Sequence, residues 1–263
     1  MKMVAQADLT EARDVLLEDG SSARNTCFHV DAGGNQQAFL VEFSGAKLAA
    51  HFHHVRQFQV IVAGDGGRVG KAAVPPISFH YTDPDSPYGP IVPGPSGSIS
   101  FFTLRPRASK GTFYMPGSRD RMSAHAGRNV VVQVPRIPPL ETESVLEELI
   151  HRHDDGLAAH RLRLARRAVA PGPELAGSGG QYYLLYAGSL LFDAREVRPH
   201  TLGWVEPDEK APVLRAGDNG ADVLVLQFPV ASAVEAAGLL DEVDAPQFSG
   251  DGPRIADAQL VSI

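Results

Sequence analysis

Three histidines lie within four positions of the stretch GAKLAAHFHHVRQFQVIVAG, residues 45–64. In a β-strand, residues two apart point to the same face, so His51 and His53 project together. Imidazole nitrogen is a common ligand of zinc, iron and nickel, and ligands must converge on one point. The spacing of these two histidines therefore predicts a site for a divalent metal ion.

Gln57 has the same parity as the two histidines, but four extended residues span about 13 Å. The ligands of one ion must place their donor atoms about 2 Å from it. We therefore expect the chain to turn at residues 54–56, so that Gln57 begins the next, antiparallel strand beside the imidazoles. The run FQVIV that follows is typical of a strand, and Gly64 ends it.

The same stretch resembles motif 1 of the cupin superfamily: Gly, five residues, His-x-His, three or four residues, Glu, six residues, Gly. Four residues match that spacing, namely Gly45, His51, His53 and Gly64. Gln57 stands where Glu is usual. The resemblance implies an antiparallel barrel of the jelly-roll type. It also implies one divalent ion, zinc, iron, manganese or nickel, held by His51, His53 and Gln57.

The second motif of that family, Pro-x-Gly-x-x-His, is altered in this sequence. In the stretch TDPDSPYGPI, residues 82–91, Tyr88 takes the place of the expected histidine. Using Tyr88 keeps the normal distance between the two motifs, whereas using His80 requires an unusually short connection. Both residues remain candidates for completing the site and for catalysis.

A dication held by two imidazoles, an amide and a phenol would keep most of its charge and act as a Lewis acid. Beside such an ion the pKa of Tyr88 would fall from about 10, so that Tyr88 could serve as acid or base. Asp83 and Asp85 are candidates for the missing negative charge, although Asp-Pro residues more often make turns. Arg56 is a candidate anchor for a substrate carboxylate.

Two β-rich regions of the chain repeat each other at an offset of 123 or 124 residues. The matching positions are Ala63-Gly64 with Ala187-Gly188, Pro76 with Pro199, Pro84-Asp85 with Pro207-Asp208, and Gly97 with Gly220. We infer a tandem duplication of a β domain, which together with the motif implies a bicupin. At this offset His51 and His53 fall on Leu175 and Gly177, so that only the first copy can hold a metal.

The fold class predicted is all-β, with two tandem cupin-type (jelly-roll) β-barrels joined by a mostly helical linker. The first barrel covers residues 1–135, the linker residues 136–170 and the second, degenerate barrel residues 171–263. The helix prediction depends on an apolar stripe of Val145, Leu146, Leu149 and Ile150. The basic run HRLRLARRA is predicted to be a solvated helix face that pairs with acidic residues 141–148. His151 and His153 would diverge on such a helix and form no site.

Composition limits the partners of the chain. With 263 residues, 43% hydrophobic content and a formal charge of −7, a soluble protein that avoids nucleic acid is expected. No apolar run is long enough for a bilayer, so no membrane partner is expected. No signal peptide is indicated, and the one cysteine, Cys27, fits the cytoplasm and is predicted to be a small core residue. We expect a small-molecule substrate and a monomer or homodimer.

These features favour a metal-dependent enzyme that works on small molecules in the first barrel. Its reaction would be Lewis-acid isomerisation, cyclisation or lyase cleavage of a carbonyl or enol, or dioxygenase chemistry on an enol or phenol. The alternative is a non-catalytic barrel that binds or senses a small ligand. The altered second motif and the loss of histidines from the second barrel support that alternative.

Overall fold

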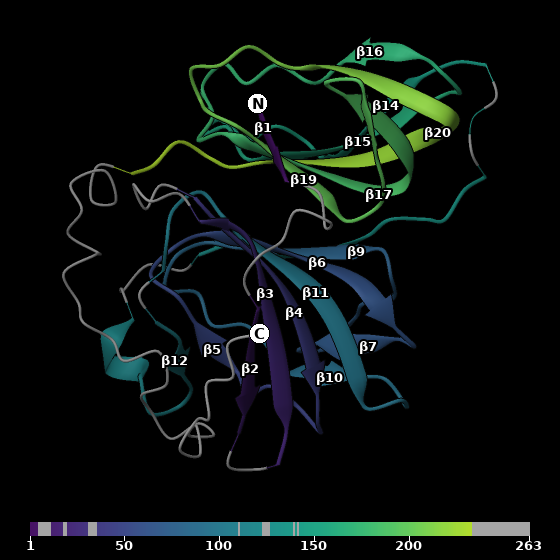
Figure 1. Cartoon of the computed structure of the whole chain (residues 1–263). Helices are drawn as coiled ribbons and strands as arrows, with labels where there is room; N and C mark the ends of the chain where they lie inside the picture. Colours follow the sequence, from purple (N-terminus) through teal and green to yellow (C-terminus); the bar gives the residue numbers. More distant parts are fainter. Residues whose placement is uncertain are drawn as a thin grey trace. The chain divides into compact units, whose positions relative to one another are not determined.

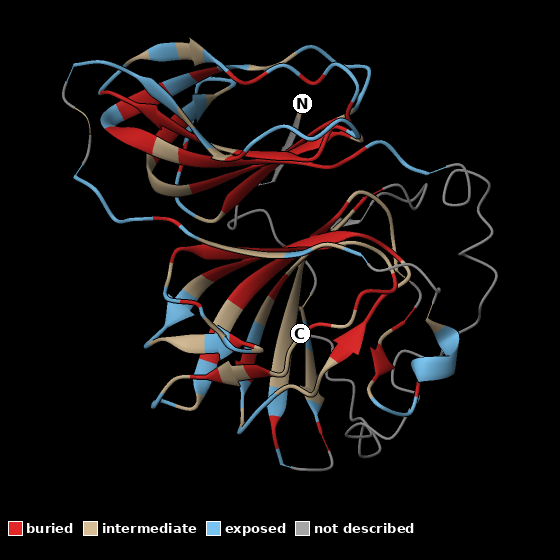
Figure 2. Ribbon diagram, turned by 180° about the vertical axis from the view of Figure 1, so that it is seen from behind, coloured by how far each residue is buried: buried red, intermediate tan, exposed pale blue. Residues whose placement is uncertain are grey.

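The computed structural model describes residues 1–4, 12–17, 20–30, 36–109, 111–122, 127–138, 140 and 142–232. They form two compact units, each a β-barrel (Figure 1). The N-terminal barrel is the described part of Thr10–Pro135, and the C-terminal barrel is that of Met1–Leu9 and Arg136–Ala233. Buried residues, red in Figure 2, run along the strands of both units.

The N-terminal barrel is built on an antiparallel sheet of seven strands in the order β13-β9-β6-β11-β4-β3-β2. In chain order these strands are β2 (Ala12–Leu16), β3 (Ser22–Val30), β4 (Gln37–Ser44), β6 (Gln57–Gly64), β9 (Ser78–Thr82), β11 (Ser98–Arg105) and β13 (Asn129–Gln133). Two small sheets complete the unit. One pairs β10 (Ile91–Pro93) with β7 (Gly67–Val69) and β8 (Ala72–Ala73), and the other pairs β12 (Phe113–Tyr114) with β5 (His51–Phe52).

The C-terminal barrel is an eight-stranded sheet with the order β1-β19-β17-β20-β15-β14, to which β16 adds on β20 and β18 on β17. Its strands are β1 (Lys2–Val4), β14 (Val145–Ile150), β15 (Ala158–Leu164), β16 (Val169–Pro171), β17 (Gln181–Phe192), β18 (Arg195–Val197), β19 (Thr201–Val205) and β20 (Val213–Gln227). The strand next to β19 thus comes from the first residues of the chain.

The two barrels repeat one topology, which confirms the inferred duplication. The order β13-β9-β6-β11-β4-β3 corresponds strand for strand to β1-β19-β17-β20-β15-β14. β6 and β17 both begin with a glutamine, and both carry a glycine with positive φ, Gly64 at 129° and Gly188 at 74°. The interior of the C-terminal barrel is a packed apolar core. Leu175, at the repeat position of His51, belongs to that core and is 3% exposed.

The predicted mostly helical linker is wrong. The described part of residues 136–170 contains no α-helix and contributes β14, β15 and β16 to the C-terminal barrel. Residues 161–164 alternate polar and apolar, which is the period of a strand, and Asp155-Gly156 is a hairpin signal. Gly156 has the positive φ, 92°, that this turn uses. The apolar stripe suggested a helix because β14 is an edge strand with a register shift between Glu148 and Ile150, which gives its apolar residues an irregular spacing.

The basic run is likewise not a solvated surface. Arg161 and Arg163 are 1% and 4% exposed, and they lie on the same face of β15. The carboxylate of Asp222 on β20 accepts hydrogen bonds from both: Arg161 Nη2 at 3.2 Å and Arg163 Nε at 3.1 Å. Glu147 on β14 lies 3.7 and 3.8 Å from the same two guanidinium groups. Two buried cations therefore depend on carboxylates from both neighbouring strands.

Replacing Asp222 by Asn should destabilise the C-terminal barrel by about 3 kcal/mol, because two buried guanidinium groups lose a charged partner. Thermal unfolding followed by the fluorescence of Trp204, the only tryptophan, measures this. Trp204 is buried in the same barrel, 2% exposed.

The matched control is Asp218→Asn, which removes the carboxylate of an exposed pair with Arg167 in the same barrel. That variant should unfold close to the wild-type temperature, because exposed ion pairs contribute little. Equal shifts for the two variants would contradict this account of the buried cluster.

Candidate functional site

The N-terminal barrel contains a cavity of about 600 Å³ with an apolar and a polar region. The apolar region includes Val15, Leu17, Val41, Phe43 and Phe101. The polar region includes His51, His53, Gln59, Tyr88, Thr103 and Arg105. Among the described residues that line the cavity there are two arginines, Arg13 and Arg105, and no aspartate or glutamate. The described part of the cavity wall therefore holds basic side chains and no acidic ones.

The bend between β5 and β6 assembles the polar region. β5 ends at Phe52, the chain bends at residues 54–55, and Gln57 is the first residue of β6. The rings of His51 and His53 lie edge to face with centroids 5.4 Å apart. The structure thus brings the two histidines and Gln57 into one cluster. The chain turns at the residues where the geometry of an extended strand predicted a turn.

A continuous chain of hydrogen bonds connects these side chains. Tyr88 Oη lies 2.6 Å from His51 Nε2, and Gln57 Nε2 donates to Tyr88 Oη at 2.6 Å. Arg105 then donates from Nε to Gln57 Oε1 at 3.0 Å and from Nη2 to His53 Nε2 at 3.1 Å. The order is therefore His51, Tyr88, Gln57, Arg105, His53.

Arg105 is a site residue that no motif in the sequence indicated. It closes β11, the strand SISFFTLR, which pairs with β6. A charged residue at the end of a strand that is otherwise buried was the available signal. Which residue it would meet depended on the register between β11 and β6, and the sequence did not supply that register.

Backbone carbonyls fix the orientation of both imidazoles. His51 Nδ1 lies 2.7 Å from the carbonyl oxygen of Ala49, and His53 Nδ1 lies 2.5 Å from that of Gly111. A carbonyl only accepts, so each Nδ1 carries the proton and each Nε2 is left as an acceptor. Both acceptors point into the hydrogen-bond chain.

Burial keeps the two imidazoles neutral. It lowers the pKa of His51 to about 4, and the nearby charge of Arg105 adds to this effect. The pKa of His53 is held well below its ordinary value for the same two reasons. Burial also raises the pKa of Tyr88 above its ordinary value, although the charge of Arg105 opposes the change. The protein environment therefore does not by itself give Tyr88 the lowered pKa that was expected beside a metal ion.

The three predicted ligand atoms do not fit a divalent ion while Arg105 is in place. His51 Nε2 is bonded to Tyr88, and Gln57 Oε1 and His53 Nε2 both accept from the guanidinium. No group of three or more histidine, cysteine, aspartate or glutamate side chains suited to a metal occurs among the described residues. An ion bound to His53 Nε2 would lie within about 5 Å of a permanent cation. An ion at this point requires the guanidinium to move.

His80 lies behind Tyr88 and is not part of the cavity wall. It projects from β9, its ring centroid is 4.9 Å from that of Tyr88, and its Nε2 lies 2.8 Å from Asn129 Oδ1. Burial lowers the pKa of His80 to about 4. Of the two candidates from the second motif, Tyr88 is thus the one that contacts His51 and Gln57.

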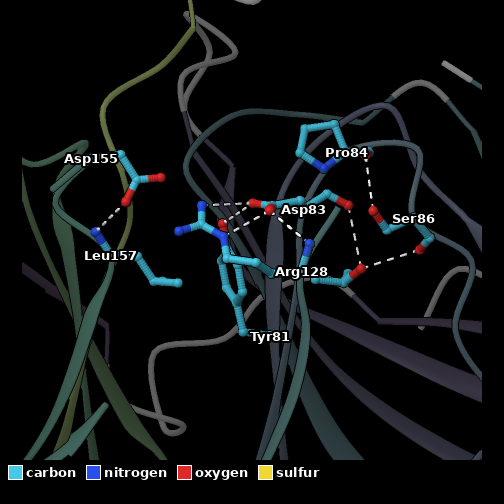
Figure 3. Close-up of polar contacts among 8 residues, drawn as sticks. Tyr81, Asp83, Pro84, Ser86, Arg128, Asp155 and Leu157 are labelled. Atoms are coloured by element: carbon cyan, nitrogen blue, oxygen red, sulfur yellow. Dashed lines mark hydrogen bonds and ion pairs between the residues drawn. The ribbon is translucent and has the colours of Figure 1, made fainter. Parts of the chain in front are cut away.

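Asp83 and Asp85 hold the turn before Tyr88 and do not line the cavity. Asp83 accepts hydrogen bonds from Arg128 Nε at 2.8 Å and from Tyr81 Oη at 2.6 Å (Figure 3). Burial alone would raise the pKa of Asp83, but Arg128 holds it below its ordinary value. Asp85 pairs with His54. Neither carboxylate supplies charge to the cluster.

Two other expectations need correction. Arg56 is buried, 7% exposed, and is not among the residues that line the cavity, so it does not anchor a ligand there. Cys27 is not a core residue: it is half-buried on β3 and lines the cavity. The only thiol of the chain is therefore a natural probe of this cavity.

Comparison with known proteins identifies the fold. No protein-family model matches the sequence, and no curated protein sequence matches it. Solved structures do match. A Nostoc punctiforme protein provisionally described as a dioxygenase is 7% identical with a TM-score of 0.63, over 88% of this chain and 84% of that one.

Two further matches have metals in their descriptions. Escherichia coli pirin YhhW in complex with nickel(II) is 10% identical, TM-score 0.54, over 88% of this chain and 99% of that one. Bacillus subtilis oxalate decarboxylase, which has Mn(II) centres, is 12% identical, TM-score 0.55, over 88% and 78%. The chain therefore has the fold of the cupin superfamily in its two-barrel form. No helix in the described ranges has the length and hydropathy needed to cross a bilayer.

The buried histidines predict that acid destabilises the N-terminal barrel. Below pH 6.5 the unfolded chain binds protons that His51 and His80, with pKa near 4, do not bind when folded. Stability should therefore fall as the pH drops from about 6.5 toward 4. The loss is on the order of 3 kcal/mol for each independent histidine.

The measurement is thermal unfolding at pH 7.5 and pH 5.0, followed by the reaction of Cys27 with a dithiodipyridine reagent. The buried Trp204 reports the C-terminal barrel in the same samples, and its transition should shift less. An unchanged Cys27 transition between these two pH values would contradict the assignment of neutral buried histidines.

Proposed function

We propose that the N-terminal barrel is the active site of a small-molecule enzyme that moves a proton on a carbonyl, enol or phenolic substrate. The observation that carries the proposal is the 2.6 Å contact between Tyr88 Oη and His51 Nε2 on the wall of a cavity of about 600 Å³. A cavity of that size is in the range of small-molecule sites, and its mixed lining suits a molecule with a polar end and an apolar body.

Three features of the pair support proton transfer. Tyr88 donates to the acceptor nitrogen of His51, and Ala49 holds the opposite nitrogen of the ring as a donor. Gln57 donates to the Tyr88 oxygen and so fixes the direction of the hydroxyl proton. Tyr88 can then take a proton from a substrate hydroxyl as it passes its own to His51 Nε2. The reverse transfer to a substrate carbon or oxygen completes an isomerisation.

Tyr88→Phe should reduce turnover by 10² to 10⁴-fold, because it removes the hydroxyl and keeps the buried ring. The substrate is first found by screening the wild type by NMR against enolisable ketones and phenolic acids. Tyr183→Phe is the matched control: Tyr183 is a buried tyrosine of the C-terminal barrel, 3% exposed, that donates to Gln181.

Tyr183→Phe should keep wild-type turnover. Compounds that bind the wild type and Tyr88→Phe equally, without any turnover, would establish the alternative instead. In that case the barrel is a non-catalytic binding or sensing protein.

A metal-dependent enzyme is the second candidate, with His51, His53 and Gln57 as ligands and Tyr88 or His80 completing the site. The observation that favours it is the pair of Nδ1 contacts to Ala49 and Gly111, because metal-binding histidines commonly donate their other nitrogen to a carbonyl. A bound ion would supply Lewis-acid or oxygen chemistry. This candidate requires Arg105 to leave His53 and Gln57.

Elemental analysis of the purified protein separates the two candidates. The metal-dependent enzyme should carry about one equivalent of zinc, iron, manganese or nickel that His51→Ala/His53→Ala lacks. The metal-free enzyme should carry no more metal than the double variant. Turnover that survives dialysis against a chelator would agree with the metal-free form.

A further inference from the structure

Gln59 lines the cavity with half of its amide group unpaired. It lies two residues after Gln57 on β6 and is 2% exposed. Its Oε1 atom is buried and has no hydrogen-bond partner in the described part of the chain. An unpaired buried acceptor is costly, and a donor on a bound molecule would remove that cost. The cavity therefore holds an acceptor that a ligand can satisfy.

The hydrogen bonds of Tyr88 decide which end of the Gln59 amide is unpaired. Tyr88 has one proton, which goes to His51 Nε2 because His51 Nδ1 donates to the carbonyl oxygen of Ala49. The Tyr88 oxygen therefore only accepts from Gln57, and it also only accepts from Gln59, whose hydrogen bond opposes the rise in the pKa of Tyr88. The NH2 group of Gln59 thus faces Tyr88. The carbonyl oxygen is the end that lacks a partner, and what it lacks is a donor.

The register of the sheet places Gln59 at one end of a row of cavity residues. Thr103 on β11 is paired with Gln59 on one side and with Phe39 of β4 on the other. Phe39 is paired in turn with Cys27 of β3, and all four residues line the cavity. Residues directly opposite on neighbouring strands lie on the same face of the sheet. A molecule along this row meets the polar groups of Gln59 and Thr103 and then the half-buried ring of Phe39.

We propose that Gln59 recognises the substrate by accepting a hydrogen bond from its hydroxyl group. The substrate is then a phenol or an enol whose apolar body lies over Phe39, and not a ketone without a hydroxyl. Because the other end of the same amide bonds Tyr88, the bound hydroxyl lies beside the Tyr88 oxygen. The proposal rests on the proposed function, because it specifies the substrate class of the same site.

Thr103 fits the same assignment. Its hydroxyl can donate as well as accept, so the oxygen of a substrate hydroxyl that donates to Gln59 can accept from Thr103. A ketone oxygen could accept from Thr103 but would leave Gln59 unpaired, and the oxygen of a methyl ether would do the same. The two side chains together select a group that donates and accepts at one atom, which is the property of a hydroxyl.

Saturation-transfer NMR with 4-propylphenol and its methyl ether, 4-propylanisole, tests the proposal. The two probes share the ring and the alkyl chain, and only the phenol can donate to Gln59. The wild type should bind the phenol at least tenfold more tightly than the ether, because the ether leaves the buried acceptor unpaired. This comparison uses the wild type alone, so it does not depend on whether a substitution is tolerated.

Variants locate the preference. Gln59→Met keeps the length of the side chain and removes the acceptor, so it should lose the preference for the phenol. Gln133→Met is the matched control, because Gln133 is an exposed residue of β13 in the same barrel and does not line the cavity. It should keep the tenfold preference. Phe39→Leu reduces the apolar surface, so it should weaken the binding of both probes and keep the preference.

Equal binding of the two probes by the wild type, or no binding of the phenol, would overturn the proposal. A preference for the phenol that survives in Gln59→Met would also overturn it. Phenol binding that depends on Gln59, without turnover of any phenol or enol, would refute the proposed enzyme and leave this inference standing. Turnover of a ketone that is lost in Tyr88→Phe and unchanged in Gln59→Met would do the reverse.

Discussion

The site of the N-terminal barrel depends on one buried guanidinium that is oriented by neutral acceptors. Arg105 reaches Gln57 and His53 because the end of β11 lies beside the start of β6, so its donors enter the cluster that the bend after β5 creates. Each acceptor that a metal would use is already bonded to a donor of the protein. A molecule that binds in this cavity therefore meets donors and acceptors that are already paired with one another.

The position of Tyr88 depends on a second set of interactions outside the cavity. The turn that precedes it is fixed by Asp83, whose carboxylate accepts from Arg128 and Tyr81, and by the contact between Asp85 and His54 (Figure 3). These charged groups are not among the residues that line the cavity, so they fix the backbone of the turn from outside it. The charged groups that fix this turn are thus distinct from the hydrogen-bonded cluster in the cavity. The two are connected through the backbone of the turn.

The two barrels show how one fold can carry a site in one copy and none in the other. Both place a glutamine at the start of the corresponding strand, Gln57 of β6 and Gln181 of β17. In the C-terminal barrel that glutamine bonds Gln227 and Tyr183, and apolar side chains fill the interior. Its charged residues, Arg161 and Asp222, serve stability instead. A shared cupin fold accordingly says little about chemistry, which depends on the side chains of each barrel.

The sequence by itself determined the all-β class, the duplication and the grouping of His51, His53 and Gln57. Strand parity and the reach of four residues are local constraints that any fold must obey. The strands at residues 145–171 were mistaken for a helix, because an edge strand with a register shift can imitate helical spacing. Only the tertiary structure placed Arg105 against Gln57 and His53. That contact joins residues 48 and 52 positions apart, and it is set by the pairing of β11 with β6, which no local pattern encodes.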